Sequence, residues 1–334
     1  MALAKLRLAA HERRLPTGGT NARSVAAAFQ LYQQAVESGL IELAATSVVT
    51  VRSASRVMAR QELADGRLFG DIRLSRLSWQ DIEYMYAAMR ARGTSSAYIR
   101  RCATVLSRAL DLARKRGLIE NNPANDAARP RQSRTKPFAP PVTEVRAVLA
   151  VAAQADCEVA DAATIFASTG LRRGELLGLQ WAEVDVAARE IHVAHAVVDG
   201  GPGVGVVRKE TKRSDWRDVP LTESAVAAFR RLRERRESLC GQQVDSSWYV
   251  FGRGLTAREP MRPDDLTDRW AAARGTSPIT FLHLRHYCAT RMLDSGESYR
   301  TVADLLGNSE STLRLHYDGR TDVGKRKAIE ALEL

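Results

Sequence analysis

The sequence has few cysteines and no long hydrophobic run. Its four cysteines are widely separated, so none has the close spacing of a zinc site or of a secreted disulfide framework: Cys102, Cys157, Cys240 and Cys288. No stretch stays apolar over the roughly 20 residues that a membrane span needs, and the N-terminus lacks a signal-peptide core. We therefore expect a cytoplasmic protein without a membrane partner, in which each cysteine is a buried apolar residue or a surface thiol.

The chain is strongly basic. It has 50 lysine and arginine residues against 39 acidic ones, a net charge of +11 and an isoelectric point of about 9.8. Basic proteins of this size often bind nucleic acid, because neutralising phosphates releases counterions. A basic enzyme whose charge only keeps it in solution explains the same balance equally well. The charge alone therefore suggests a nucleic-acid partner without deciding for it.

Hydrophobic periodicity predicts helices in the first third of the chain. Apolar residues recur at helical spacing from about Ser24 to Leu63. A second helix runs through 79–85 with Ser78 as its N-cap, and a third covers about 95–115. These patterns predict an all-helical domain at 22–130, preceded by a basic tail at 1–21.

A proline-rich basic segment at 131–140 separates this domain from the rest. The basic residues in it or beside it are Arg129, Arg131, Arg134 and Lys136. They belong either to a solvated spacer or to a strap along the DNA backbone, and basic side chains on a flexible chain favour the strap.

Residues 141–334 form the second predicted domain. It is mainly helical, but three runs are rich in β-branched or alternating residues, at 190–198, 205–208 and 216–221. The predicted fold is therefore mainly α-helical with a small antiparallel β-sheet in the C-terminal domain, and helices are expected to continue from Thr222 to the end.

Cleaving DNA without a metal ion requires cations at the non-bridging phosphate oxygens, a nucleophile, and an acid for the departing oxygen. Arginine suits the first task, because its planar fork stays charged and can bind two oxygens. A candidate lies at 168–179, STGLRRGELLGL, where Gly170 permits a sharp turn and Arg172 is expected in the first turn of a helix. By itself, this segment is also explained as a helix start with a solvated arginine pair.

Two later segments carry further candidates. Residues 281–290 read FLHLRHYCAT and include Arg285, and residues 305–312 read LLGNSEST. Asn308, in the second of these segments, lies nine residues before Tyr317. A lone tyrosine is by default a core or surface residue, but Tyr317 follows both arginine segments in order.

Together these segments resemble the active-site motifs of the tyrosine recombinases, the family that includes the phage integrases and the Xer-type recombinases. The resemblance implies that Tyr317 is the nucleophile and that Arg172 and Arg285 stabilise the transition state. Glu175 matches a supporting acidic residue. His286 matches a position of supporting function, although core packing is the favoured explanation for it.

The leaving-group acid is implied by the segment at 211–221, TKRSDWRDVPL, which is similar to the family's lysine hairpin. It places Lys212 in that role. Lys209 is a competitor, and an exposed hairpin lysine without a catalytic role is the alternative.

The sequence departs from the family pattern at two positions. Leu282 stands where the family has the histidine of its second arginine motif, and leucine cannot accept a proton. His283 follows one residue later and is an uncertain substitute, because adjacent side chains on a helix point about 100° apart. Asn308 stands where the family has histidine or tryptophan after Leu-Gly. It can bind a phosphate oxygen but is neutral.

The resemblance extends more loosely over 71–82 and 117–124, so that it spans roughly residues 24–320. It implies a helical core-binding (SAM-like) DNA-binding domain at 22–130, a basic linker at 131–140 and a catalytic domain at 141–334, which clamp duplex DNA. It implies neither a cofactor nor a metal ion. Family members act as homotetramers on specific double-stranded sites, and accessory DNA-bending or directionality proteins are compatible with that function.

The predicted function is integration or excision of a mobile element or prophage through a 3′-phosphotyrosine intermediate. One rival is a weakened or inactive member that binds specific DNA without cutting it, and another is a helical transcriptional regulator whose motifs are accidental. The segment 323–334 has apolar residues at near-helical spacing. It docks either on a neighbouring protomer or on its own domain.

Overall fold

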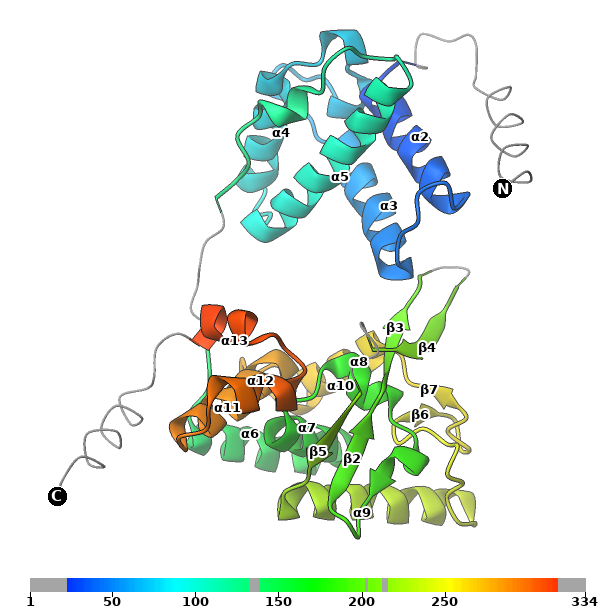
Figure 1. Cartoon of the computed structure of the whole chain (residues 1–334), viewed down its shortest axis with the longest axis vertical. Helices are drawn as coiled ribbons and strands as arrows, with labels where there is room; N and C mark the ends of the chain where they lie inside the picture. The colour runs from blue at the N-terminus through cyan, green and yellow to red at the C-terminus, as the bar shows by residue number, and fades with distance from the viewer. Residues whose placement is uncertain (1–22, 132–137, 202–203, 212–215, 318–334) are drawn as a thin grey trace, which may run out of the picture. The chain divides into compact units, whose positions relative to one another are not determined.

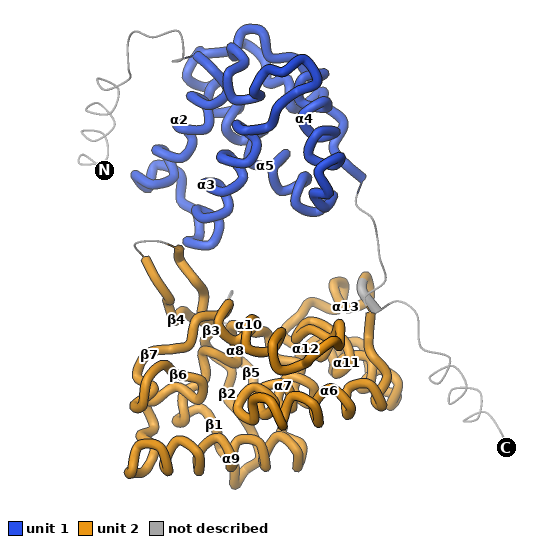
Figure 2. Tube along the Cα trace, turned by 180° about the vertical axis from the view of Figure 1, so that it is seen from behind, with its two compact units in different colours: residues 1–134 blue, residues 135–334 orange. Residues whose placement is uncertain are grey.

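The computed structural model describes residues 23–131, 138–201, 204–211 and 216–317 (Figure 1). The chain divides into two compact units, Met1–Arg134 and Thr135–Leu334 (Figure 2). The division falls in the basic, proline-rich segment at 131–140. The predicted tail at 1–21 and the C-terminal segment 323–334 lie outside the described residues. Among the described residues, no helix combines the length and the apolar character needed to cross a membrane.

The described part of unit 1 is built from helices (Figure 1). They are α2 (Val25–Glu37), α3 (Ala45–Ala59), α4 (Trp79–Ala91) and α5 (Ser96–Lys115), with 3-10 turns η1 (Phe69–Asp71), η2 (Leu74–Arg76) and η3 (Pro123–Asn125). The helical spacing predicted from about Ser24 to Leu63 belongs to two helices, α2 and α3, because Gly39 adopts a φ of 75° just after α2 and ends it. Ser78 caps α4 as predicted, because its hydroxyl accepts from the Asp81 amide over 3.2 Å.

The core of unit 1 forms around α5. This helix packs against α2, α3 and α4, and its buried face repeats at helical spacing. Its fully buried members include Ile99, Cys102, Leu106 and Leu110. Burial raises the pKa of the Cys102 thiol to about 11, so this cysteine serves as a small apolar core residue.

Unit 2 is mainly helical as well, which confirms the predicted fold class. Its helices are α6 (Val142–Ala155), α7 (Cys157–Thr169), α8 (Arg173–Gly178), η4 (Trp181–Glu183), α9 (Glu223–Cys240), α10 (Pro263–Ala273), α11 (Phe281–Asp294), α12 (Tyr299–Leu306) and α13 (Glu310–Tyr317). Helix α7 is the central element, and α6, α9, α10 and α11 pack against it. The site described below starts where α7 ends.

The described strands of unit 2 form three small antiparallel sheets rather than the single predicted sheet. The strands are β1 (Val184–Asp185), β2 (Glu190–Val193), β3 (His195–Asp199), β4 (Val206–Glu210), β5 (Arg217–Pro220), β6 (Gly252–Arg253) and β7 (Glu259–Pro260). Their order is β1-β2-β5, β3-β4 and β6-β7. The run 190–198 is divided at Ala194, whose carbonyl accepts from the Thr211 amide, so that its two halves pair with different partners. The strands β6 and β7 interrupt the helices expected after Thr222, and two residues are too few to show a period.

Candidate active site

Arg172 lies at the junction between α7 and α8. Gly170 ends α7 in the left-handed region with a φ of 63°, and Arg172 has extended backbone, so it is the N-cap of α8 rather than a residue of its first turn as predicted. Its amide donates to Glu175 Oε2 over 2.8 Å, and its Nη1 donates to Glu175 Oε1 over 2.6 Å. The side chain stays 45% exposed, so it is both anchored and open to a ligand.

Arg285 reaches the same place from α11. Its residue is 9% exposed, and its Nη1 donates to the carbonyl oxygen of Gly170 over 2.5 Å. Its Nη2 donates to the carbonyl oxygen of Leu306 over 2.8 Å. Arg285 therefore joins the end of α7 to the end of α12, and the two predicted arginines lie in one site.

Glu175 is buried, with 1% of the residue exposed, and binds two arginines. Besides Arg172, it accepts from Arg217 Nη2 over 2.8 Å and from Arg217 Nη1 over 3.3 Å. Burial by itself raises the pKa of Glu175, but hydrogen bonds and charge from Arg217, with the charge of Arg172, hold that pKa below its ordinary value. The carboxylate is therefore kept ionised by its two guanidinium partners.

Arg217 was not predicted as a site residue. It begins β5, five residues after Lys212, within the segment 211–221 that resembles the lysine hairpin. A signal was present in the sequence, since Arg217 and Val219 share one face of a strand and Val219 is an apolar core residue. An arginine on an inward face requires a buried partner, and Glu175 is that partner.

The turn between α12 and α13 supplies the last predicted residues. Asn308 Oδ1 accepts from Arg172 Nη2 over 2.8 Å, and the carbonyl oxygen of Gly307 accepts from the same nitrogen. Tyr317 is the last residue of α13, and its side chain lies outside the described part of the chain. Lys212 also lies outside the described residues.

A cavity of about 630 Å³, which we call the active-site cavity, opens beside these groups. Its charged and polar lining includes Arg172, Arg285, His286, Asn308 and Thr312. The remaining walls are largely apolar and aromatic, among them Leu171, Trp270, Phe281 and Leu282. A ligand in this cavity would meet cationic side chains beside apolar ones, where electrostatic attraction is stronger than in water.

Leu282 and His283 take different directions at the start of α11. Leu282 lines the active-site cavity and is 59% exposed. His283 is absent from that lining: its Nδ1 accepts from the Thr280 amide over 3.3 Å, and its ring packs edge-on against Phe138 at 5.3 Å. His283 thus caps the helix, and the one-residue shift that would bring it into the site does not occur here.

The structure describes two of the four basic residues predicted to bind DNA at the linker. Arg129 and Arg131 are exposed, whereas Arg134 and Lys136 lie outside the described residues. The chain between Arg129 and Arg131 is fixed to the helices of unit 1, because Arg100 Nη1 donates to the carbonyl oxygen of Pro130 over 3.0 Å. Arg129 and Arg131 therefore project from an anchored segment.

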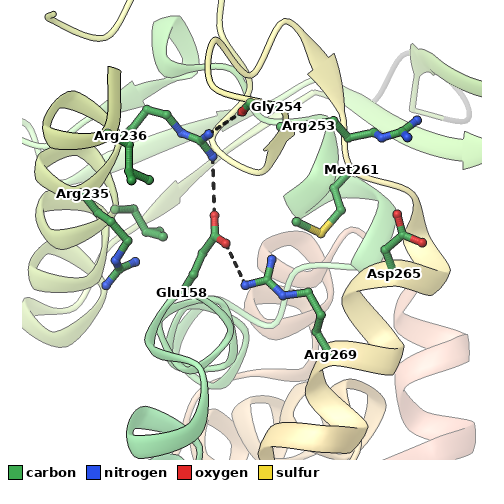
Figure 3. A pocket seen from close by; sticks show the side chains of 11 residues that line it. Glu158, Arg235, Arg236, Arg253, Gly254, Met261, Asp265 and Arg269 are labelled. Atoms are coloured by element: carbon green, nitrogen blue, oxygen red, sulfur yellow. Dashed lines mark hydrogen bonds and ion pairs between the residues drawn. The ribbon is translucent and has the colours of Figure 1, made fainter. Parts of the chain in front are cut away.

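A second arginine-rich cavity, of about 370 Å³, lies on the opposite face of α10, and we call it the Glu158 cavity (Figure 3). Glu158 forms ion pairs with Arg236 at 3.5 Å and with Arg269 at 2.8 Å. Arg235, also in its lining, binds Asp161. Three of its arginines, Arg235, Arg236 and Arg269, are matched by carboxylates from nearby elements. None of its lining residues was singled out by the sequence.

Comparisons with known proteins match the sequence to a family. The Phage integrase family matches residues 141–319. Tyrosine recombinase XerC of Shewanella amazonensis is 29% identical over 246 residues, which are 72% of this chain and 76% of that protein.

Two solved structures share the fold. The Tn1549 transposon integrase in complex with a circular intermediate DNA has a TM-score of 0.70 at 20% identity, over 91% of this chain and 99% of that chain. A lambda integrase tetramer bound to a Holliday junction has a TM-score of 0.64 at 18% identity, over 90% of this chain and 79% of that chain. The family match covers more than half of the sequence, and it includes both arginine motifs and Tyr317. The chain belongs to the phage integrase family of tyrosine recombinases, enzymes that cleave and rejoin DNA strands.

Proposed function

We propose that this chain is a site-specific recombinase that cleaves and rejoins DNA through a 3′-phosphotyrosine intermediate formed by Tyr317. The observation that carries the proposal is the convergence of Arg172 and Arg285 on the turn that leads into α13. They come from separate segments, both bind backbone carbonyls of residues 306–307, and both line the active-site cavity. Tyr317 ends the helix that follows this turn.

The chemistry assigns one task to each group. The Tyr317 oxygen attacks the phosphorus and gives its proton to a water molecule, and the bond from phosphorus to the 5′-oxygen breaks. The 5′-oxygen accepts a proton from Lys212 and leaves as a hydroxyl. Arg172 and Arg285 bind the non-bridging oxygens, where charge increases in the transition state. Religation reverses these steps, so the phosphodiester energy is kept in the protein–DNA bond.

The biological role that we propose is integration or excision of a mobile element. The two solved structures described above are integrases, one of a transposon and one named lambda integrase. The lambda structure is described as a tetramer on a Holliday junction, and we propose the same number of protomers here. Arg129 and Arg131 would bind phosphates along the site, as would Arg134 and Lys136.

Relaxation of supercoiled plasmid in EDTA tests this function. Wild type should relax the plasmid and leave a protein–DNA adduct on a denaturing gel, whereas Tyr317→Phe should do neither, because phenylalanine has no nucleophilic oxygen. Tyr299→Phe is a matched control on α12, and it should keep the activity. Absence of relaxation and adduct with wild type, even on DNA that carries the element's ends, would refute the catalytic proposal.

A second candidate function has its own observation. Leu282 occupies the wall of the active-site cavity where the family has a histidine, and His283 is engaged in capping α11. A protein with this site could bind specific DNA and cleave it slowly or not at all, because a general acid–base group contributes roughly 10²–10⁴-fold. Specific binding without adduct would support this candidate over the first.

A further inference from the structure

The end of α12 has more carbonyls than its own turn can satisfy. The last carbonyls of a helix lack intrahelical partners. Gly307, with a φ of 63°, closes the helix. Its amide donates to the backbone carbonyl of Asp304 over 3.1 Å, and the Asn308 amide donates to the backbone carbonyl of Ala303 over 2.9 Å. The carbonyls that follow, at residues 305–307, point out of this turn and need other donors.

Each of these three carbonyls accepts from an arginine of a different segment. Arg217 Nε donates to Leu305 over 2.8 Å, Arg285 Nη2 donates to Leu306 over 2.8 Å, and Arg172 Nη2 donates to Gly307. The negative end of the α12 dipole favours cations at this place. Because carbonyls are neutral, they fix the direction of a guanidinium without cancelling its charge.

We propose that Arg217 is a positioning residue for strand cleavage, which holds Glu175 and the end of α12 so that Arg172 faces the scissile phosphate. This inference rests on the proposed function. Arg217 is only 11% exposed at its side chain, and its donors bind Leu305 and Glu175, so it acts through its neighbours and not on DNA. Arg172, its neighbour on the same carboxylate, is the exposed member of the pair.

Two details of the geometry support this role. A Cβ atom on Gly307 would lie 2.7 Å from Arg217 Nη1 and 3.1 Å from Arg172 Nη1, so the turn is packed directly against both guanidiniums. Arg217 also spans three elements, from β5 to α8 and to α12. A lysine could keep the charge, but its single ammonium cannot bind two carboxylate oxygens and a carbonyl in fixed directions.

Cleavage of a nicked duplex that carries the element's end sequence tests the inference. The nick lets the product strand diffuse away, so the first-order cleavage rate and the DNA Kd are measured separately. Arg217→Gln should lower the rate at saturating protein about 10- to 100-fold, since misplacement by about 1 Å can cost that much, and leave Kd within about twofold. Arg217→Lys should recover part of the rate.

A sulfur-substituted substrate shows which catalytic group is affected. In a 5′-bridging phosphorothiolate substrate, the leaving group is a thiolate, which departs without a proton. This substrate should therefore relieve the defect of Lys212→Ala. The defect of Arg217→Gln should persist, because Arg217 acts through Arg172 at the non-bridging oxygens. Relief of the Arg217→Gln defect by the thiolate would overturn the assignment.

Arg236 provides the matched control, at the Glu158 cavity (Figure 3). Its side chain is also 11% exposed, and it also binds a carboxylate and a backbone carbonyl, those of Glu158 and Gly254. Arg236→Gln should therefore lose a similar set of contacts and keep the wild-type cleavage rate. An equal rate loss in both variants, or wild-type cleavage by Arg217→Gln, would overturn the inference.

Failure of the proposed function can be distinguished from failure of this inference. If wild type does not cleave the duplex, the proposed function fails, and amide hydrogen exchange still tests the positioning role of Arg217. Arg217→Gln should then speed amide exchange at 303–313 relative to Arg236→Gln, because the end of α12 loses an anchor. Unchanged exchange in that segment would contradict the positioning role.

Discussion

Two arginine clusters among the described residues of unit 2 differ in the groups that mainly accept their hydrogen bonds. At the active-site cavity, Arg172, Arg217 and Arg285 bind four backbone carbonyls, and within the described residues the carboxylate shared there is Glu175. At the Glu158 cavity and beside it, arginines of α9 and α10 bind three carboxylates, those of Asp156, Glu158 and Asp161. Arg236 also donates to the backbone carbonyls of Gly254 and Leu255, so carboxylates are the main acceptors here rather than the sole ones.

This difference distinguishes arginines that join helices from arginines whose charge is left for a ligand. A carboxylate holds an arginine and also cancels its charge, which suits a contact between helices. A carbonyl holds the arginine and leaves the positive charge for a ligand. We therefore propose that the active-site cluster binds an anion, whereas the Glu158 cluster joins α9 and α10 to α7 through ion pairs.

The largest expected effect is on the cleavage rate, which should depend on the active-site cluster and not on the Glu158 cluster. Arg172→Ala should lower the cleavage rate about 10³-fold, because one cation at the non-bridging oxygens is lost. Arg231→Ala, which removes a partner of the buried Asp161, should change the unfolding midpoint and leave cleavage intact. Single-turnover cleavage with urea unfolding of the same samples measures both. Equal activity in the two variants would remove the distinction between the clusters.

Glu175→Gln should produce the next largest effect, on stability. Removing one partner of a buried ion pair typically costs about 3–5 kcal/mol, and here both Arg172 and Arg217 lose their carboxylate. Since the pKa of Glu175 is held below its ordinary value of 4.5, this stabilisation is present above about pH 4.5 and is lost as the pH falls through the lower folded pKa.

Urea unfolding across pH checks the sign of this effect. The difference in unfolding free energy between wild type and Glu175→Gln should stay constant above about pH 5 and shrink in more acidic buffer. A difference that grows on acidification would contradict the ionised state of Glu175.

Leu282→His should have a smaller effect, in the direction of higher activity. It places a proton-transfer group in the wall of the active-site cavity, and we expect the cleavage rate to rise about 10- to 100-fold near neutral pH. His283→Gln is the control and should leave the rate unchanged, because His283 caps α11. A large rate loss in His283→Gln would show that this histidine does reach the substrate.

The smallest expected effect concerns the linker. Arg131→Ala should weaken DNA binding about equally for all sequences and reduce the slope of log K against log salt by about 0.9, the loss of one phosphate contact. Fluorescence anisotropy at several salt concentrations measures the slope. Arg231→Ala serves again as control, and an unchanged slope in Arg131→Ala would favour the solvated spacer.

The sequence predicted those parts of the molecule that depend on local pattern. Ser78 and the apolar spacing of 95–115 identified α4 and α5, because capping and amphipathicity are properties of neighbouring residues. The motif positions of Arg172, Arg285 and Asn308 were predicted to lie in one site, and the described geometry brings these three together.

The rest depended on tertiary contacts that local pattern does not contain. The split at Ala194 follows from pairing with two distant strands, and the role of Arg217 depends on Glu175 and Leu305, 42 and 88 residues away. His283 was ambiguous in sequence, since a one-residue shift at the start of α11 decides which side chain enters the cavity. The cap with Thr280 fixes that register.

The most direct test of the account is to identify the residue that is joined to DNA. Wild type is trapped on a nicked duplex that carries the element's end, digested with protease, and the DNA-linked peptide is sequenced by mass spectrometry. The account predicts one adduct, through Tyr317, to the 3′-phosphate of the cleaved strand, with a free 5′-hydroxyl on the other fragment. An adduct through another residue, or attachment to a 5′-phosphate, would contradict it.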